Sequence, residues 1–232
     1  MFERHNAPTS YDEFEFVRRQ MVERQIRVRG IRDTRLLAAM MAIPRHAFVP
    51  RERISDAYAD APLPIGDDQT ISQPFMVAAM ADAVVLKGDE RVLEIGAGSG
   101  YQAAVLSLLA RDVTAIETIP RLVGRARERL GRLGYRNVRV IEADGSLGWT
   151  LSAPYDAIVV SAAAPFVPQP LLDQLAEGGR LAIPVGDAEF QQVLRITNRD
   201  GQAVREQLYR CRFVPLVGRH GWSDAVQKVP SE

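Results

Sequence analysis

The sequence predicts one α/β domain with a mostly parallel, doubly wound sheet that ends in an antiparallel pair, preceded by an N-terminal helical extension. Between about residues 89 and 186, short β-branched runs alternate with helical patterns. This alternation is typical of βαβ units in a parallel sheet. Two strand patterns joined by a turn signal follow, and helical patterns fill most of residues 11–86. We therefore divide the chain into an extension (1–86), a core (87–222) and a polar tail (223–232).

Composition excludes several classes of protein. The 232 residues are 47% hydrophobic and 25% charged, which is ordinary for a soluble globular chain. Lys+Arg and Asp+Glu both total 29, so no net charge attracts nucleic acid or an acidic membrane. The single cysteine, Cys211, precludes an internal disulfide and agrees with a reducing compartment. Met1–Asp12 lacks a signal-peptide pattern, and the apolar runs are too short to span a bilayer. We expect a cytoplasmic protein.

The extension begins with two predicted helices. Gly30 stops the first, whose apolar residues fall near helical spacing: Phe14, Val17, Met21 and Ile26. Asp33 is placed to cap the second, which Pro44 ends. Residues 61–70 contain two prolines and a glycine and predict a loop. A third helix then opens at Ser72, which is placed as its N-cap.

The core alternates strands and helices. Predicted strands are Arg91–Ile95, Val113–Glu117, Val138–Glu142, Ala157–Ser161 and Arg180–Pro184, with helices at 101–110, 120–133 and 168–176. Val193–Thr197 and Ala203–Val214 are strand patterns joined across Asn198-Arg-Asp-Gly201, which is a hairpin signal.

A glycine-rich turn follows the first core strand. Gly96, Gly98 and Gly100 come directly after Glu94 and Ile95, and a helix begins at once. Glycine lets the backbone turn sharply and approach a ligand where a Cβ would clash. A dinucleotide fingerprint requires a small residue at position 101, where this chain has Tyr101. The turn therefore favours a cofactor without a pyrophosphate over a nicotinamide cofactor.

Two acidic residues extend this prediction. Glu117 ends the second strand, where a carboxylate accepts hydrogen bonds from ribose hydroxyls. Asp144 and Gly145 follow the third strand, where Asp144 is placed to reach an adenine amino group, although Asp-Gly is equally explained as a turn. Together these residues predict a nucleoside site at the carboxyl edge of the sheet.

These motifs are similar to those of the Rossmann-like class I methyltransferases that use S-adenosylmethionine. The rest of the chain resembles one family among them, the bacterial-type protein-L-isoaspartate (D-aspartate) O-methyltransferases. The resemblance covers about residues 17–218, and its diagnostic element is Gln69-Thr-Ile-Ser-Gln-Pro74. Other matching segments are Arg29-Gly-Ile, Met41-Ala-Ile-Pro-Arg-His-Ala-Phe-Val-Pro50, Tyr58-Ala-Asp-Ala-Pro-Leu-Pro-Ile-Gly66, Ser161-Ala-Ala-Ala-Pro165, Gly179-Arg-Leu-Ala-Ile-Pro-Val-Gly186 and Arg212-Phe-Val-Pro-Leu216.

The resemblance implies methyl transfer to the free carboxylate of L-isoaspartyl, and possibly D-aspartyl, residues in damaged proteins. It makes Ser72 the active-site residue, within a substrate loop formed by Thr70, Ile71, Ser72 and Gln73. It makes 87–222 the cofactor-binding core, with contacts from Gly96, Ala97, Gly98, Gly100, Glu117, Asp144 and Gly145. Val77 and Val217 depart from residues found in some relatives, so no contact is assigned to them. His46 lacks an acidic partner in sequence and is interpreted as structural.

The expected chemistry needs no general base, because a main-chain-type carboxyl, with a pKa of about 3.3–3.7, is ionised at neutral pH. Ser72 is expected to orient the substrate carboxylate, although a helix cap explains the serine alone and both roles are compatible. Three alternatives compete: a methyltransferase for a small molecule or RNA base, an inactive cofactor-binding module, and a nicotinamide-dependent oxidoreductase. Basic residues Arg27, Arg29 and Arg32 intersperse with acidic ones and indicate a solvated face rather than an RNA surface. We expect a monomer without a metal, nucleic acid or membrane partner.

Overall fold

The computed structural model describes residues 11–223, so all but the first residue of the predicted polar tail lies outside it. The extension contains α1 (Tyr11–Met21), α2 (Thr34–Ala42), β1 (Leu63–Gly66), β2 (Gln69–Ile71) and α3 (Pro74–Ala83). The core contains β3 (Arg91–Ile95), α4 (Tyr101–Ser107), β4 (Asp112–Glu117), α5 (Pro120–Arg132), β5 (Val138–Glu142), β6 (Tyr155–Val160), α6 (Gln169–Asp173), β7 (Leu175–Gly186), β8 (Gln191–Arg199) and β9 (Gln202–Cys211).

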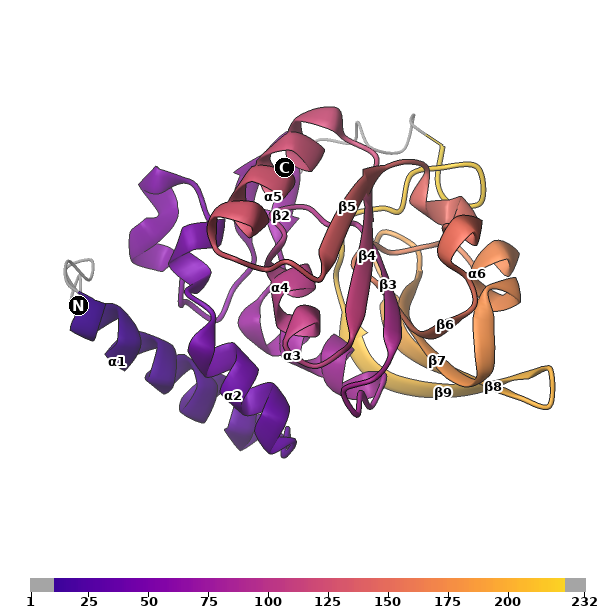
Figure 1. Ribbon diagram of the computed structural model, residues 1–232, viewed down its shortest axis with the longest axis horizontal. Helices are drawn as coiled ribbons and strands as arrows, with labels where there is room; N and C mark the ends of the chain where they lie inside the picture. Colours follow the sequence, from indigo (N-terminus) through magenta and orange to yellow (C-terminus); the bar gives the residue numbers. More distant parts are fainter. Residues whose placement is uncertain (1–10, 224–232) are drawn as a thin grey trace.

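The sheet confirms the predicted fold class. Its seven strands have the order β5-β4-β3-β6-β7-β8-β9 (Figure 1). The pairs from β5 to β7 are parallel, whereas β7–β8 and β8–β9 are antiparallel. The chain enters at β3, builds outward to β5, and then returns to the other side of β3 with β6. This reversal puts a switch point at the carboxyl end of β3, where doubly wound sheets bind ligands.

Two hydrophobic clusters cover the two faces of the sheet. The larger contains buried side chains from α2, α3, α4 and α5 together with Val92, Val113 and Val159. The smaller contains Leu93 and Ile158 with residues of α6 and the C-terminal segment. Figure 1 accordingly shows α3, α4 and α5 on one side of the sheet and α6 on the other. Because the larger cluster also contains α1 and α2 residues, the extension shares its core with the sheet.

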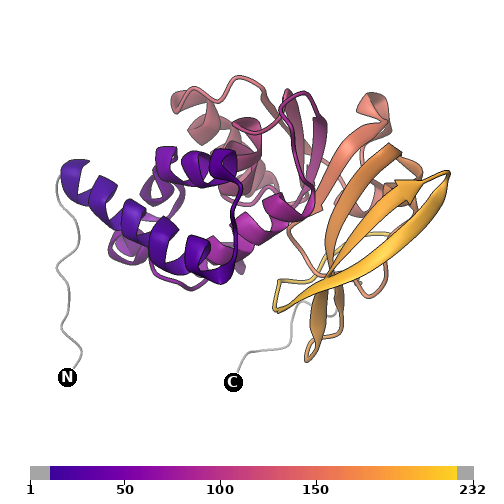
Figure 2. The same ribbon diagram turned by 90° about the horizontal axis from the view of Figure 1, so that it is seen from below.

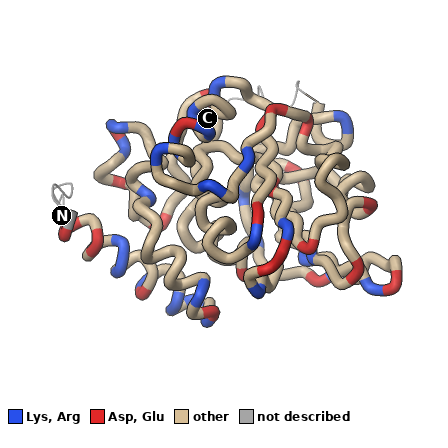
Figure 3. The backbone as a smooth tube through the Cα atoms, in the orientation of Figure 1, with Lys and Arg blue, Asp and Glu red and all other residues tan. Residues whose placement is uncertain are grey.

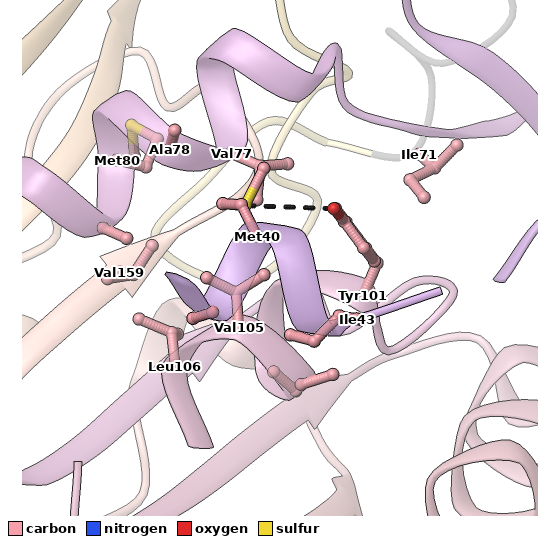
Figure 4. Close-up of a cluster of buried hydrophobic side chains, with 14 of the residues drawn as sticks. Met40, Ile43, Ile71, Val77, Ala78, Met80, Tyr101, Val105, Leu106 and Val159 are labelled. Carbon is pink, nitrogen blue, oxygen red and sulfur yellow. Dashed lines mark hydrogen bonds between the residues drawn. The ribbon is translucent and has the colours of Figure 1, made fainter. Parts of the chain in front are cut away.

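Side chains from the extension and the core meet around Met40. Figure 4 shows Met40 of α2 beside Val77 of α3, with Tyr101 of α4 pointing toward its sulfur. The Tyr101 hydroxyl donates to the Met40 sulfur at 3.8 Å. Tyr101 is 1% exposed and Met40 is fully buried, so the extension is held to the core by close packing.

The first two helices form as predicted. Asp33 accepts hydrogen bonds from the backbone N–H groups of Arg35 and Leu36 and so caps α2. After α1, the helical segment continues through a π turn (Val22–Ile26) and a 3₁₀ turn (Arg27–Arg29), and it ends at Gly30. Gly30 has φ +99°, a conformation that costs glycine little.

The predicted loop at 61–70 is wrong, because β1 and β2 form a hairpin there. Leu63 pairs with Ile71, and both side chains are buried. Asp67 and Asp68 make the turn with φ of 54° and 55°, a left-handed conformation that Asp tolerates better than most residues. The prolines and the glycine therefore occupy a short strand and its turn instead of an irregular loop.

The predicted cap at Ser72 is also wrong. The first backbone bond of α3 runs from the N–H of Val77 to the carbonyl of Gln73, which makes Gln73 the N-cap, without a side-chain cap bond. Pro74 occupies the first turn, where its missing N–H costs nothing. The hydroxyl of Ser72 lies one residue outside the cap position.

The C-terminal hairpin is confirmed, with Asp200 and Gly201 between β8 and β9. The helix predicted at 168–176 ends at Asp173, because Leu175 already pairs with Tyr155 in the sheet. Figure 2 shows β8 and β9 at the end of the molecule opposite α1 and α2.

Acidic and basic residues are mixed along the chain. Blue and red segments alternate along the tube in Figure 3, and no single sign covers a region. Arg27 pairs with Glu23 at 2.9 Å, and Arg29 pairs with Asp60. These pairs agree with a solvated face at the predicted basic residues. Between residues 11 and 223, no helix is long and apolar enough to cross a membrane.

Candidate functional site

A cavity of about 310 Å³ opens at the carboxyl ends of β3, β4 and β6. Its walls come from six parts of the chain that the fold brings together. The lining residues are Gln69–Ser72, Val77, Ile95–Ser99, Tyr101, Gln102, Ile116–Pro120, Gly145, Ser161, Ala162 and Val214–Val217. The cavity therefore lies at the switch point of the sheet, as the glycine turn predicts.

The glycine turn forms one wall of the cavity. Gly96 and Gly98 have φ of +86° and +51°. The N–H groups of Gly96 and Ala97 donate to the carbonyl of Ile116 at 2.8 and 3.0 Å, which holds the turn against the end of β4. A Cβ at Gly96 would lie 3.6 Å from Ser161, so conformation, more than space, explains this glycine.

Glu117 presents its carboxylate at the cavity wall from the end of β4. Oε2 accepts a hydrogen bond from the N–H of Gly98 at 2.8 Å. Oε1 accepts from the N–H groups of Thr118 and Ile119 at 2.8 and 3.0 Å. A carboxylate offers about four acceptor positions, so roughly one, on Oε2, stays free for a ligand.

Residues 70–72 form another part of the wall. Ser72 is half-buried, and its hydroxyl has no hydrogen-bond partner among the described residues. Gln73 does not line the cavity, because its side-chain amide donates to Asp60 Oδ1 at 2.8 Å. The neighbouring Ile71 is buried, which fixes the end of the hairpin directly before Ser72.

Asp144 and Gly100 lie outside the cavity walls. The Asp144 carboxylate accepts from the Ser146 N–H and hydroxyl and from the N–H of Arg219. It therefore ties the C-terminal segment to the turn after β5. A Cβ at Gly100 would lie 3.2 Å from Leu130, so this glycine allows α5 to approach the turn. Gly145 does line the cavity.

Sequence reasoning missed most of the wall formed by residues 214–217, where it had singled out Val217 alone and assigned it no contact. These residues come after the antiparallel pair and fold back across the sheet edge. Ala163 donates its N–H to Val214 at 2.8 Å, and Leu216 donates its N–H to Ala163 at 2.8 Å. The Trp222 indole also donates to the Ala163 carbonyl, at 3.1 Å. Ser161 also lines the cavity and could have been found from its place at a strand end. Val77 and Val217, to which no contact was assigned, line it as well.

Burial raises the pKa of two groups near the glycine turn. Glu94 is fully buried, and neither of its carboxylate oxygens has a hydrogen-bond partner among residues 11–223. Desolvation, and secondarily Glu117, raise the pKa of Glu94 well above its usual value. Burial raises the pKa of Tyr101 to about 12. Glu117 and Tyr101 are the ionisable side chains that line the cavity, and no histidine, cysteine or lysine among the described residues lines it.

His46 lies away from the cavity. Its Nδ1 is 2.8 Å from the Tyr58 hydroxyl, and its ring stacks on Phe14 with centroids 3.9 Å apart. Burial, followed by the charge of Arg18, lowers the pKa of His46. These contacts join α1 to the segment after α2, which agrees with a structural role.

Comparison with known proteins gives one family. The model of the protein-L-isoaspartate(D-aspartate) O-methyltransferase family matches residues 17–221. The chain is 53% identical over 210 residues to the protein-L-isoaspartate O-methyltransferase of Geobacter metallireducens, covering 90% of this chain and 97% of the relative. It is 53% identical over 208 residues to the enzyme of that name from Methanoregula boonei, with 89% and 95% covered.

Solved structures agree with this comparison. A protein-L-isoaspartate O-methyltransferase superposes with a TM-score of 0.80 at 31% identity, over 88% of this chain and 67% of that one. A candidate protein-L-isoaspartate O-methyltransferase from Plasmodium falciparum, solved with S-adenosyl-L-homocysteine, gives 0.74 at 26% identity, over 86% and 98%.

Proposed function

We propose, since this chain belongs to the protein-L-isoaspartate(D-aspartate) O-methyltransferase family, that it methylates the free carboxylate of L-isoaspartyl residues in damaged proteins. S-adenosylmethionine is the methyl donor and S-adenosylhomocysteine the product. One observation carries the proposal: a single cavity combines a strand-end carboxylate, Glu117, with the hydroxyl of Ser72, and no histidine, cysteine or lysine from residues 11–223 lines it.

The cavity residues fit the donor. Gly96 and Gly98 bring bare backbone to one wall, and Glu117 Oε2 has a free acceptor position for a ribose hydroxyl. Ile95, Ile116 and other apolar side chains supply surface for a nucleoside base. Within this proposal Ala97 and Gly145 contact the donor directly, whereas Gly100 and Asp144 support the walls from behind.

The chain's residues mainly position the nucleophile. S-adenosylmethionine, when bound, supplies a methyl carbon on a positively charged sulfur. The isoaspartyl carboxylate is already ionised at neutral pH, so no side chain has to remove a proton. Alignment at about 3–3.5 Å between reacting atoms is then the main contribution of the protein.

Ser72 is the residue proposed to align the carboxylate. Its hydroxyl is free to donate a hydrogen bond, because it is neither the cap of α3 nor bonded elsewhere in residues 11–223. The N-terminus of α3 lies beside it and favours an anion. Thr70, Ile71 and Gln73 complete the substrate loop of the proposal, with Gln73 acting through Asp60.

The proposal includes three finer expectations, which concern location and partners, the roles of the two parts of the chain, and a second substrate class. We expect the protein to act in the cytoplasm as a monomer. We also expect no nucleic-acid or membrane partner, because acidic and basic residues are mixed along the chain (Figure 3). The extension (1–86) supplies the substrate loop and the core (87–222) the donor site. D-aspartyl residues are a second proposed substrate class, since the name of the family includes D-aspartate.

The test is transfer of labelled methyl from S-adenosylmethionine to an isoaspartyl peptide and to its normal aspartyl twin. We expect label in the first peptide alone, in a base-labile ester. Equal labelling of both, or of neither while RNA or a small molecule accepts the methyl, would overturn the proposal.

A further inference from the structure

The function described above does not explain Arg45. This residue stands in the segment Pro44–Phe48, one of those that carry the family resemblance, and its side chain is completely buried. It forms no ion pair with any carboxylate in residues 11–223, and burial lowers its pKa. An unpaired buried charge is costly, so a purely structural position would favour an apolar side chain.

The Arg45 guanidinium instead joins three segments. Nε donates to the carbonyl of Ala57 at 2.7 Å, and Nη2 donates to the carbonyl of Ser72 at 2.8 Å. Its Cζ lies 4.8 Å from the centroid of the Tyr101 ring. Because Ser72 and Tyr101 both line the cavity, Arg45 supports its wall from behind.

Ser72 depends on this contact more than its neighbours do. Ile71 is paired with Leu63 in the hairpin, and Gln73 is tied to Asp60 by its amide. The hydrogen bond from Arg45 to the Ser72 carbonyl is the one that the structure shows for Ser72 itself. A planar guanidinium can hold two carbonyls in fixed directions, which an ammonium on a flexible stem does poorly.

We propose that Arg45 is a positioning residue for methyl transfer, which holds the Ser72 carbonyl and thereby aims the Ser72 hydroxyl into the cavity. The proposal rests on the proposed role of Ser72. Arg45 itself touches neither the substrate nor the donor.

Two variants and a matched control test this role. Arg45→Met removes the donors at similar length, and Arg45→Lys keeps the charge without the fork. Arg18→Met is the control, since Arg18 is 7% exposed and also donates to a backbone carbonyl, that of Met41, but does not reach Ser72. Both Arg45 variants should lower kcat/KM for isoaspartyl peptide at least tenfold, while affinity for S-adenosylhomocysteine stays within threefold. Arg18→Met should keep kcat/KM within threefold at a temperature where it is folded.

A double-variant comparison separates positioning from general damage. In a Ser72→Ala background, Arg45→Met should lower the rate by less than threefold, because the hydroxyl that it aims is already gone. A full tenfold loss in that background, or unchanged rates in both Arg45 single variants, would overturn the proposal. If Arg45→Met does not fold, Arg45→Lys is compared in the same two backgrounds.

Hydrogen exchange makes the test independent of the proposed substrate. Amides of residues 69–76 should exchange at least tenfold faster in the Arg45 variants than in Arg18→Met, with no peptide present. Faster exchange together with no isoaspartyl activity in the parent protein would refute the proposed function and leave Arg45 as the anchor of this segment. Unchanged exchange would refute the anchor itself.

Discussion

Replacing Glu117 by glutamine tests the donor site most directly. The amide of Glu117→Gln keeps its shape, and its oxygen can still accept from Thr118 and Ile119. Its NH₂ group then replaces Oε2, faces the N–H of Gly98, and removes the free acceptor position. A hydrogen bond to a charged group contributes about 1.5–3 kcal/mol, so affinity for S-adenosylhomocysteine should fall roughly ten- to a hundredfold.

Glu142→Gln is the matched control for this prediction. Glu142 ends β5 directly opposite Glu117 in the parallel register, but it is exposed and does not line the cavity. Calorimetric titration should show parent-like affinity for this control. Thermal melts give a second measurement, since ligand at a hundred times the parent Kd stabilises by about 2.7 kcal/mol, falling to about 1.4 or 0.4 kcal/mol for ten- or hundredfold weaker binding. Unchanged affinity in Glu117→Gln, or equal losses in both variants, would refute the assignment.

Four further outcomes are expected. Ser72→Ala and Ser72→Gly should have similar melting temperatures, close to that of the parent protein, since Ser72 is not the cap of α3. Both should lose at least tenfold in the rate of methyl transfer. A large difference between their melting temperatures would show that Ser72 caps the helix after all. The rate of methyl transfer at saturating donor should be flat from about pH 6 to 8, because the substrate carboxylate is ionised and burial raises the pKa of Tyr101 to about 12. A steep rise in this rate near pH 7 would reveal a general base. Burial raises the pKa of Glu94, so the folded state holds its proton more tightly than the unfolded chain, and stability is lost as pH rises from the unfolded pKa toward the folded one. Glu94→Gln should therefore gain in melting temperature over the parent more at pH 8 than at pH 5, and equal gains would contradict this. Gly124→Ala should raise stability by about 0.4–1 kcal/mol in denaturant melts, because Gly124 lies exposed in α5 with open space around its Cβ position; a loss would contradict that geometry.

Local patterns in the chain predicted the elements whose boundaries depend on nearby residues. Asp33 caps α2 because its side chain reaches backbone groups two and three residues away. The β3 and β5 boundaries follow directly from β-branched runs between turn residues, and both strands end where expected. The glycine turn and Glu117 follow strand ends, and the carboxyl ends of parallel strands meet at one sheet edge. Their convergence could therefore be inferred without coordinates.

Distant contacts decided the remainder. Whether 61–70 forms a hairpin depends on Leu63 and Ile71 being buried together. The local excess of proline and glycine does not reveal this contact. Whether Ser72 caps α3 depended on which carbonyl accepts the first bond of the helix, and Arg45, which donates to the Ser72 carbonyl, lies 27 positions earlier. The cavity wall at Val214–Val217 arises because the chain returns across β6 after an antiparallel excursion. Sequence periodicity records which face of an element is apolar, but not which distant segment covers it, so these three features were settled by tertiary structure alone.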